Sequence, residues 1–305
     1  MSNLILNVNN EWNSLKKVIV GIATSWGPNP RADEAVDPKS RQHILAGTYP
    51  VESDVKKELE GLVSILEENG VEVLRPQSST DLNQVFTRDV GVVIENKLIR
   101  SSMIADRAPE WDGISGLFEN LNTENILIPP NGVRIEGGDI MPMGDEIWVG
   151  YSEKEDFDTF KTSRTNSEAM VWLREKFPRK NIRGFQLKKS DTNPRTNALH
   201  LDCCLCPLSG GQVIFHPEGL KLDSDVAWVR NHFAGKIHEV DAEAMYNMHC
   251  NLFTISPGII ISGKGFEVVN EKLRAWGYQV IEIPFNETAK LEGLLRCVTL
   301  PIYRD

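Results

Sequence analysis

The stretch NLFTISPGIIISGKGFEVVNEKLRAWGYQVIEIP, residues 251–284, contains one complete unit of the pattern that decides the fold. Two apolar runs separated by Pro257 and Gly258 predict a β-hairpin. Residues 266–276 then have the apolar spacing of an amphipathic helix, and YQVIEIP returns to the pattern of a strand. The unit therefore reads as two strands, a helix and a third strand.

The same order of elements recurs along the chain. Strand-like segments that follow a helical pattern lie at residues 71–76, 125–130, 181–187 and 236–241. Helical apolar spacing precedes them at residues 55–66, 111–121, 167–177 and 224–233, and hairpin patterns lie at residues 90–103, 139–152 and 201–217. In the first of these helices, Ser53 is the expected N-cap and Gly70 the expected C-terminal stop.

The fifth hairpin requires both ends of the chain. KKVIVG at residues 16–21 and CVTLPIY at residues 297–303 supply the two remaining apolar runs, and pairing them would close the repeat into a ring. We therefore predict five ββαβ modules about a pseudo-fivefold axis, in a single α/β domain over residues 1–305. The alternative is an α/β protein with one open sheet, which is the weaker reading because the hairpin recurs together with the helix.

Composition and charge narrow the range of functions. The chain has 305 residues, of which 41% are hydrophobic and 25% charged, and a formal net charge of −10. A globular protein with a sizeable core fits these proportions. The negative charge disfavours a nucleic acid or an anionic membrane surface as partner, because both would be repelled, and favours a small cationic substrate. A homo-oligomer is compatible with the sequence.

The cysteines and the N-terminus indicate the compartment. The five cysteines are an odd number and three of them crowd at positions 203, 204 and 206, which is not typical of a disulfide framework. Adjacent residues of a strand point to opposite faces, so Cys203 and Cys204 do not suit one metal ion. No signal-like N-terminus and no apolar stretch of about 18 residues occurs. We expect a cytoplasmic protein without a metal.

One polar residue opens the first strand of each predicted hairpin, and a ring would bring the five together at one end of its axis. These residues are Asp89, Asp139, Asp202, Asn251 and Cys297. Carboxylates in an apolar neighbourhood are costly unless they are paired. A planar guanidinium with its fork of N–H donors suits two facing carboxylates, so a guanidinium group is the expected ligand.

Other reactive residues stand close to these positions in the sequence. Glu136 precedes Asp139 by three residues, and His200 precedes Asp202 by two, which on a strand would place both side chains on one face. A thiol, an imidazole and carboxylates are the parts of covalent catalysis. A lone cysteine is more often a small buried hydrophobe and a lone histidine more often structural. The position of Cys297 in the repeat favours the nucleophile instead.

Taken together, these residues resemble the guanidino-group-modifying, or pentein, superfamily, whose members share a five-bladed α/β-propeller. The motifs are FTRD at residues 86–89, EGGD at 136–139, SRTN at 163–166, HLD at 200–202 and LRCVTLP at 295–301. In this order they resemble the arginine deiminase pattern over nearly the whole chain. NEWNSLKKVIVG at residues 10–21 is instead similar to the amidinotransferases.

The resemblance implies a role for each residue. Cys297 would be the nucleophile, and Glu136 and His200 would handle protons. The substrate-binding residues would be Asp89 and Asp202 as clamps of the guanidinium, Asn83 and Arg164 at the amino-acid end, with Phe86, Asp139 and Asn251 around them. The resemblance further implies catalysis without a metal or a cofactor.

Three functions follow from the resemblance. A hydrolase of the deiminase or dihydrolase type would release the carbon held by Cys297 to water, and an amidinotransferase would release it to an acceptor amine. A non-catalytic assembly factor of the same fold ranks last, because the thiol, imidazole and carboxylates are all present. Glu292 and Gly293 stand where deiminases commonly have an arginine and a Gly-Gly pair, which puts free arginine as substrate in question. The irregular stretch 27–50 is the one long loop, and such loops often cover a site.

Overall fold

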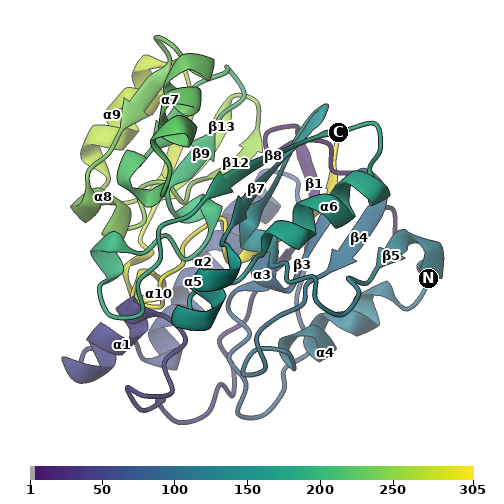
Figure 1. The fold of residues 1–305 in the computed structure, drawn as a ribbon. Helices are drawn as coiled ribbons and strands as arrows, with labels where there is room; N and C mark the ends of the chain where they lie inside the picture. The colour runs from purple at the N-terminus through teal and green to yellow at the C-terminus, as the bar shows by residue number, and fades with distance from the viewer. Residues whose placement is uncertain (1–3) are drawn as a thin grey trace.

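The computed structural model describes residues 4–305, whose strands form five three-stranded sheets (Figure 1). In every sheet two strands form an antiparallel pair, and a third strand runs parallel to the middle one. This confirms the five ββαβ modules of an α/β-propeller and contradicts a single open sheet. The predicted domain also includes residues 1–3, which lie outside the described residues.

The sheet made from both chain ends has β1 (Leu15–Val20) in its middle. This strand runs antiparallel to β15 (Thr299–Arg304) and parallel to β2 (Glu72–Leu74). Figure 1 shows β1, in purple, beside the yellow C-terminal end of the chain. The two termini therefore close the repeat, as the leftover apolar runs predicted.

The other four sheets each come from one continuous segment. They are β3 (Gly91–Ile94), β4 (Lys97–Arg100) and β5 (Ile126–Leu127); β6 (Ile140–Met143), β7 (Glu146–Tyr151) and β8 (Asn181–Gln186); β9 (Leu205–Pro207), β10 (Val213–Phe215) and β11 (Ile237–Glu239); and β12 (Phe253–Ser256), β13 (Ile259–Gly263) and β14 (Gln279–Ile283). All five strands predicted after a helix, and all predicted hairpins, are present.

One helix in each module connects the middle strand to the third strand. These helices are α2 (Glu52–Glu68), α4 (Glu110–Ser115) with the 3₁₀ turn η1 (Gly116–Phe118), α6 (Ser167–Lys176), α7 (Asp223–His232) and α9 (Glu267–Ala275). Shorter helices lie in the connections: α1 (Pro38–Leu45), α3 (Thr87–Val90), α5 (Lys154–Thr159), α8 (Ala242–Tyr246) and α10 (Asn286–Ala289). Further 3₁₀ turns are η2 (Thr123–Asn125), η3 (Gly137–Asp139), η4 (Pro194–Thr196), η5 (Leu201–Cys203) and η6 (Pro217–Gly219).

The start of α2 differs from the prediction. The helix begins at Glu52 with Val51 as N-cap, so Ser53 is inside the first turn. The Glu52 carboxylate accepts the backbone N–H of Trp26 at 2.7 Å, which holds the helix start against the preceding loop. The negative charge of Glu52 in the first turn also favours this start, because it interacts favourably with the positive N-terminal end of the helix dipole. Gly70 follows the helix with φ of +76°, which confirms it as the C-terminal stop.

The beginnings of three inner strands bear on function. A short helical turn precedes each of them: α3 before β3, η3 before β6 and η5 before β9. Asp89, Asp139 and Asp202 lie in these turns and not on the strands, as does His200 at the N-cap of η5. The prediction that these residues open a strand is therefore wrong by one turn. In a turn, side chains no longer alternate between two faces, so His200 and Asp202 need not share one.

Candidate active site

The five repeat positions form one connected cluster. The Sγ of Cys297 lies 3.7 Å from Oδ2 of Asp202 and accepts a hydrogen bond from Nδ2 of Asn251 at 3.1 Å. Oδ1 of Asp139 accepts the backbone N–H of Leu201, next to Asp202, at 3.0 Å. The remaining acid, Asp89, reaches the cluster through His200, and all five repeat residues are buried. The ring thus brings together positions that are up to 208 residues apart (Asp89 to Cys297) in sequence.

The glycines of the EGGD motif allow this close approach. A Cβ added to Gly137 would lie 2.0 Å from the carbonyl oxygen of Arg88, and one added to Gly138 would lie 2.7 Å from both Asp89 and His200. Real Cβ atoms essentially never show such distances. The motif therefore serves to let three chain segments meet at the site, and no phosphate is needed to explain it.

Asn251 holds Cys297 in place. Its Oδ1 accepts the backbone N–H groups of Arg296 at 2.9 Å and of Cys297 at 3.2 Å, while its Nδ2 donates to the sulfur. Burial raises the pKa of the Cys297 thiol well above its usual range, and the charges of Asp202 and Asp89 raise it further. The resting cysteine is therefore a thiol, and a cation must arrive before it becomes the more reactive thiolate.

His200 lies between two carboxylates. Its Nε2 is 2.9 Å from Oε2 of Glu136, and its Nδ1 is 3.5 Å from Oδ1 of Asp89. Burial alone would lower the pKa of His200, but the charges of Asp89, Asp139 and Glu136 outweigh burial and raise it. Burial likewise opposes ionisation of Glu136, yet Arg164 at 3.2 Å and His200 hold the pKa of Glu136 well below its usual range. The resting pair is an imidazolium and a carboxylate.

Donor atoms of Asp89, Glu136 and His200 lie within 4.8 Å of one another, a spacing that would suit a metal ion. Each carboxylate, however, already has a cationic partner. Arg107 donates to Oδ2 of Asp89 at 2.8 Å, and Arg164 donates to Oε2 of Glu136 at 3.2 Å. Two guanidinium groups this close would repel a divalent ion. The cluster therefore fits proton transfer better than metal binding.

We expect Glu136→Gln to lower the pKa of His200, because glutamine keeps an acceptor but removes one of the charges that favour the imidazolium. The raised pKa stabilises the folded protein below pH 6.5, the ordinary value, and this contribution is lost as the pH rises through the folded-state pKa. This contribution to stability should be smaller in the Glu136→Gln variant. NMR titration of the histidine Hε1 signals measures the change, with His43 on α1 as an internal control. An unchanged His200 titration would contradict the assignment.

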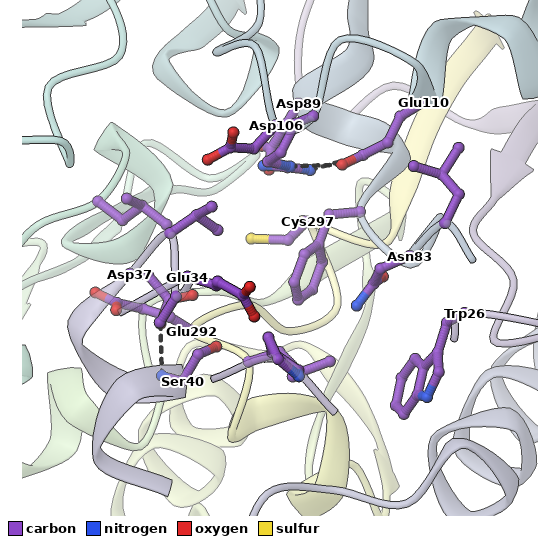
Figure 2. A pocket seen from close by; sticks show the side chains of 18 of the residues that line it. Trp26, Glu34, Asp37, Ser40, Asn83, Asp89, Asp106, Glu110, Glu292 and Cys297 are labelled. Atoms are coloured by element: carbon purple, nitrogen blue, oxygen red, sulfur yellow. Dashed lines mark hydrogen bonds and ion pairs between the residues drawn. The ribbon is translucent and has the colours of Figure 1, made fainter. Parts of the chain in front are cut away.

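A cavity of about 510 Å³ opens beside this cluster. Six of the predicted site residues line it: Asn83, Phe86, Asp89, Arg164, His200 and Cys297. Figure 2 shows the Cys297 thiol in the middle of the cavity, with Asp89, Asp106 and Glu110 on one side and Glu34, Asp37 and Glu292 on the other. The predicted nucleophile and proton carrier therefore face the same enclosed space.

Four predicted site residues lie behind this wall. Glu136 contacts the cavity lining through His200 and Arg164, and Asn251 through Cys297. Asp139 is engaged by the Leu201 amide, and burial raises its pKa to about 6. Asp202 is fully buried and its Oδ2 accepts from Arg296 at 2.7 Å. Asp139, Asp202 and Asn251 thus lie behind the residues that line the cavity, with Oδ2 of Asp202 3.7 Å from the Cys297 sulfur, and their contact with substrate stays a prediction.

Several cavity residues were not foreseen from the sequence. Arg107 and Glu110 form an ion pair with N–O distances of 2.7 and 2.9 Å, and Arg107 also holds Asp89. Their i,i+3 spacing is the only signal the sequence offered. Glu34 and Asp37 come from the stretch at residues 27–50, which does border the site but is not one irregular loop, because it contains α1. Arg164 binds this stretch by donating to the carbonyl oxygen of Val36 at 2.7 Å.

Comparison with known proteins identifies similar chains. A family model described as "Arginine deiminase" matches residues 232–304. "Uncharacterized protein YkgA" of Bacillus subtilis is 30% identical, over 80% of this chain and 78% of that protein. "Bifunctional arginine dihydrolase/ornithine cyclodeaminase AgrE" of Nostoc sp. is 27% identical over 80% of this chain, which spans only 32% of that longer protein.

The fold also has solved counterparts. The amidinotransferase SxtG from Microseira wollei, described as part of the saxitoxin biosynthetic pathway, superposes with a TM-score of 0.74 at 21% identity. The alignment covers 98% of this chain and 97% of that one. Among the described residues, the helices are all too short or too polar to cross a membrane.

Proposed function

Because this chain belongs to the guanidino-group-modifying (pentein) superfamily, we propose that it is a cysteine-dependent hydrolase of arginine or a related guanidino compound, and that residues 1–305 form one catalytic domain. One observation carries this proposal. The Cys297 thiol and the His200 imidazole face the same cavity as Asp89, a buried carboxylate able to hold a guanidinium. Nucleophile, proton donor and counter-charge are thus in one place.

The first half of the reaction would form a covalent adduct. The substrate cation lowers the pKa of Cys297, the thiol gives up its proton to water, and the thiolate attacks the central carbon of the guanidinium. His200, an imidazolium at rest, donates its proton to the departing nitrogen as the C–N bond breaks. Ammonia or an amine leaves, and a thiouronium group remains on the sulfur.

In the second half, neutral His200 takes a proton from water, and the resulting hydroxide adds to the same carbon. The C–S bond then breaks, which releases a ureido product and restores the thiolate. A second round on that product would give ornithine-like products, as in a dihydrolase. Glu136 stabilises the imidazolium at 2.9 Å throughout, without contacting the substrate.

One observation favours amidino transfer as the second candidate. The amidinotransferase-like segment at residues 10–21 reaches the site, since Glu11 pairs with Arg296 at 3.0 Å, directly before the nucleophile. The similarity in fold to an amidinotransferase extends over 98% of the chain. In that reaction an acceptor amine, and not water, would attack the thiouronium carbon.

Incubation with arginine and related guanidines, with and without glycine, ornithine or lysine, separates the two candidates. Hydrolysis is expected to produce one ammonia and one ureido product per turnover without any acceptor, measured by ammonia assay and mass spectrometry. Turnover that requires an acceptor would replace the hydrolase by an amidinotransferase. Mass spectrometry of the quenched enzyme should find the adduct on the peptide that contains Cys297.

A further inference from the structure

Acidic side chains dominate the walls of the cavity. Seven of them line it, Glu34, Asp37, Asp81, Asp89, Asp106, Glu110 and Glu292, whereas its arginines are only Arg107 and Arg164. A ligand with a carboxylate at its far end would need a cation that is not already engaged. The partners of the two arginines therefore decide which ligands this cavity suits.

Both arginines already donate hydrogen bonds to carboxylates. Arg107 donates through Nε and Nη2 to Glu110 and through Nη1 to Asp89. Arg164 donates through Nε to the carbonyl oxygen of Lys161, through Nη1 to Glu136 and through Nη2 to Val36. Every guanidinium nitrogen thus already donates, and the charge of each arginine is compensated by a buried carboxylate, so within residues 4–305 neither arginine of the cavity wall is an uncompensated cation for a carboxylate ligand.

Two acids form a second negative site across the cavity from Asp89. Glu292 is only 5% exposed; it accepts from Nδ2 of Asn197 at 2.7 Å and from the Lys39 amide at 3.1 Å. Burial, and the adjacent carboxyl of Asp37, raise the pKa of Glu292 well above its usual range. The Glu292 carboxyl is therefore held toward its neutral form, and a cation bound beside it would favour the carboxylate. Glu34, in contrast, is already paired with Arg31 at 3.0 Å.

The guanidinium end of the cavity shows an independent sign of a missing ligand. Oδ1 of Asp89 is buried and makes no hydrogen bond in the described part of the chain, where Nδ1 of His200 lies 3.5 Å away, and the Asp89 side chain is only 3% exposed. A buried carboxylate oxygen without a donor is costly, so an N–H donor is expected there when substrate binds. Figure 2 shows Cys297 between this carboxylate and the pair of Asp37 and Glu292.

We propose that the substrate is a guanidino compound whose far end carries a second cationic group, held by Asp37 and Glu292, and no carboxylate. This inference rests on the proposed function and adds the class of substrate to it. A primary amine suits the pair, because its three N–H donors can reach two carboxyl groups at once. Glu292 is then the residue that selects the far end of the substrate.

Three compounds that differ only at the far end test the proposal: 4-guanidinobutylamine, arginine and 5-guanidinopentanoate. The first is arginine without its carboxylate, and the last is arginine without its amine. We expect kcat/KM to fall in this order, by at least about tenfold from the amine to the carboxylate compound, since a charge-assisted hydrogen bond is replaced by repulsion. An equal or higher kcat/KM for the carboxylate compound would overturn the proposal.

Two variants test which residues cause the preference for the amine over the carboxylate compound. Glu292→Gln and Asp37→Asn should each reduce the ratio of kcat/KM for the amine over the carboxylate compound by about tenfold. Asparagine still caps α1, where Asp37 accepts the Ser40 amide, so the loop should keep its place. Glu175→Gln makes the same substitution at an exposed acid on α6 and should leave the ratio unaltered. A ratio unaffected by Glu292→Gln would overturn the role of Glu292.

A chemical probe separates failure of this proposal from failure of the proposed function. 2-Chloroacetamidine carries an amidinium and is attacked at its CH₂ carbon by a thiolate, which forms a thioether and releases chloride. Labelling of Cys297, followed by mass spectrometry, is expected to be slowed best by 4-guanidinobutylamine. If all three compounds slow the labelling equally, the proposal of a cationic far end is overturned, but the proposed function is not. Absence of labelling at Cys297 overturns the proposed function and this inference with it.

Discussion

Replacing Cys297 with alanine should reduce kcat/KM by about 10⁴-fold or more, because among the described residues Cys297 supplies the one thiol that lines the cavity and, in the proposed mechanism, forms the covalent bond. The backbone around this position is held by Asn251, whose Oδ1 accepts the Arg296 and Cys297 amides. The substitution removes one buried sulfur and none of these bonds. The variant should thus lose most of its activity but little of its stability.

Cys204→Ala is the matched control. Cys204 is fully buried as well, and burial raises the pKa of its thiol too, but its side chain packs in a core that does not face the cavity. We expect this variant to lose about 1 kcal/mol of stability and to keep its turnover. Steady-state kinetics and thermal unfolding measured on both variants test the assignment. Comparable turnover in the two variants would remove Cys297 as the nucleophile.

Replacing Arg296 with leucine should lower the free energy of unfolding by about 3–5 kcal/mol, because buried Asp202 loses its cation and buried Glu11 keeps only Arg88, 3.8 Å away. Arg296 is 4% exposed and pairs with Asp202 at 2.7 Å and with Glu11 at 3.0 Å. It also donates to the carbonyl oxygens of Gly138 and Ile140. No comparable network surrounds the exposed ion pairs of the protein.

The effect should depend on pH. Burial opposes ionisation of Glu11, but Arg296 and Arg88 lower its pKa to about 2. A depressed pKa contributes stability above the ordinary value of 4.5, and this stability is lost as the pH falls toward 2. In Arg296→Leu much of that contribution disappears. The difference in stability between wild type and variant should therefore be larger at pH 7 than at pH 3.

Arg230→Leu is the control for this second prediction. Arg230 pairs with Glu239 at 2.6 Å, but its side chain is 52% exposed, and exposed pairs contribute at most about 1 kcal/mol. Denaturant unfolding of both variants, with Arg296→Leu/Glu11→Gln to relieve one buried charge, measures the comparison. Equal, small losses in Arg296→Leu and Arg230→Leu would show that the buried network does not stabilise the fold.

The order of elements followed from local patterns alone. Apolar spacing along each segment identified the hairpins, the helices and the third strands, and the leftover runs at both ends predicted the pairing of β1 with β15. These predictions succeed because amphipathic periodicity reflects which face each element buries. The predicted start of α2 was wrong, because the start depends on a contact between Glu52 and the amide of Trp26, 26 residues away.

The reactive groups were also visible in the sequence. Cys297, His200, Glu136 and Asp89 were singled out by type and by their place in the repeat, and the structure brings all four within one cluster. Their protonation states were not visible. A resting thiol and a resting imidazolium result from burial combined with neighbouring carboxylates, and those neighbours come from other modules.

The sequence by itself thus determined the five modules, the closure of the ring by its ends and the identity of the reactive side chains. Only the tertiary structure decided which acids face the cavity. Asp202 and Asp139 turn inward, toward Arg296 and the Leu201 amide, while Glu292 and Asp37 line the cavity. The physical reason is that a short turn before a strand has no side-chain period. The direction of each side chain in the turn is set by its tertiary partners. One such partner of Asp202 is Arg296, which lies 94 residues further along the chain.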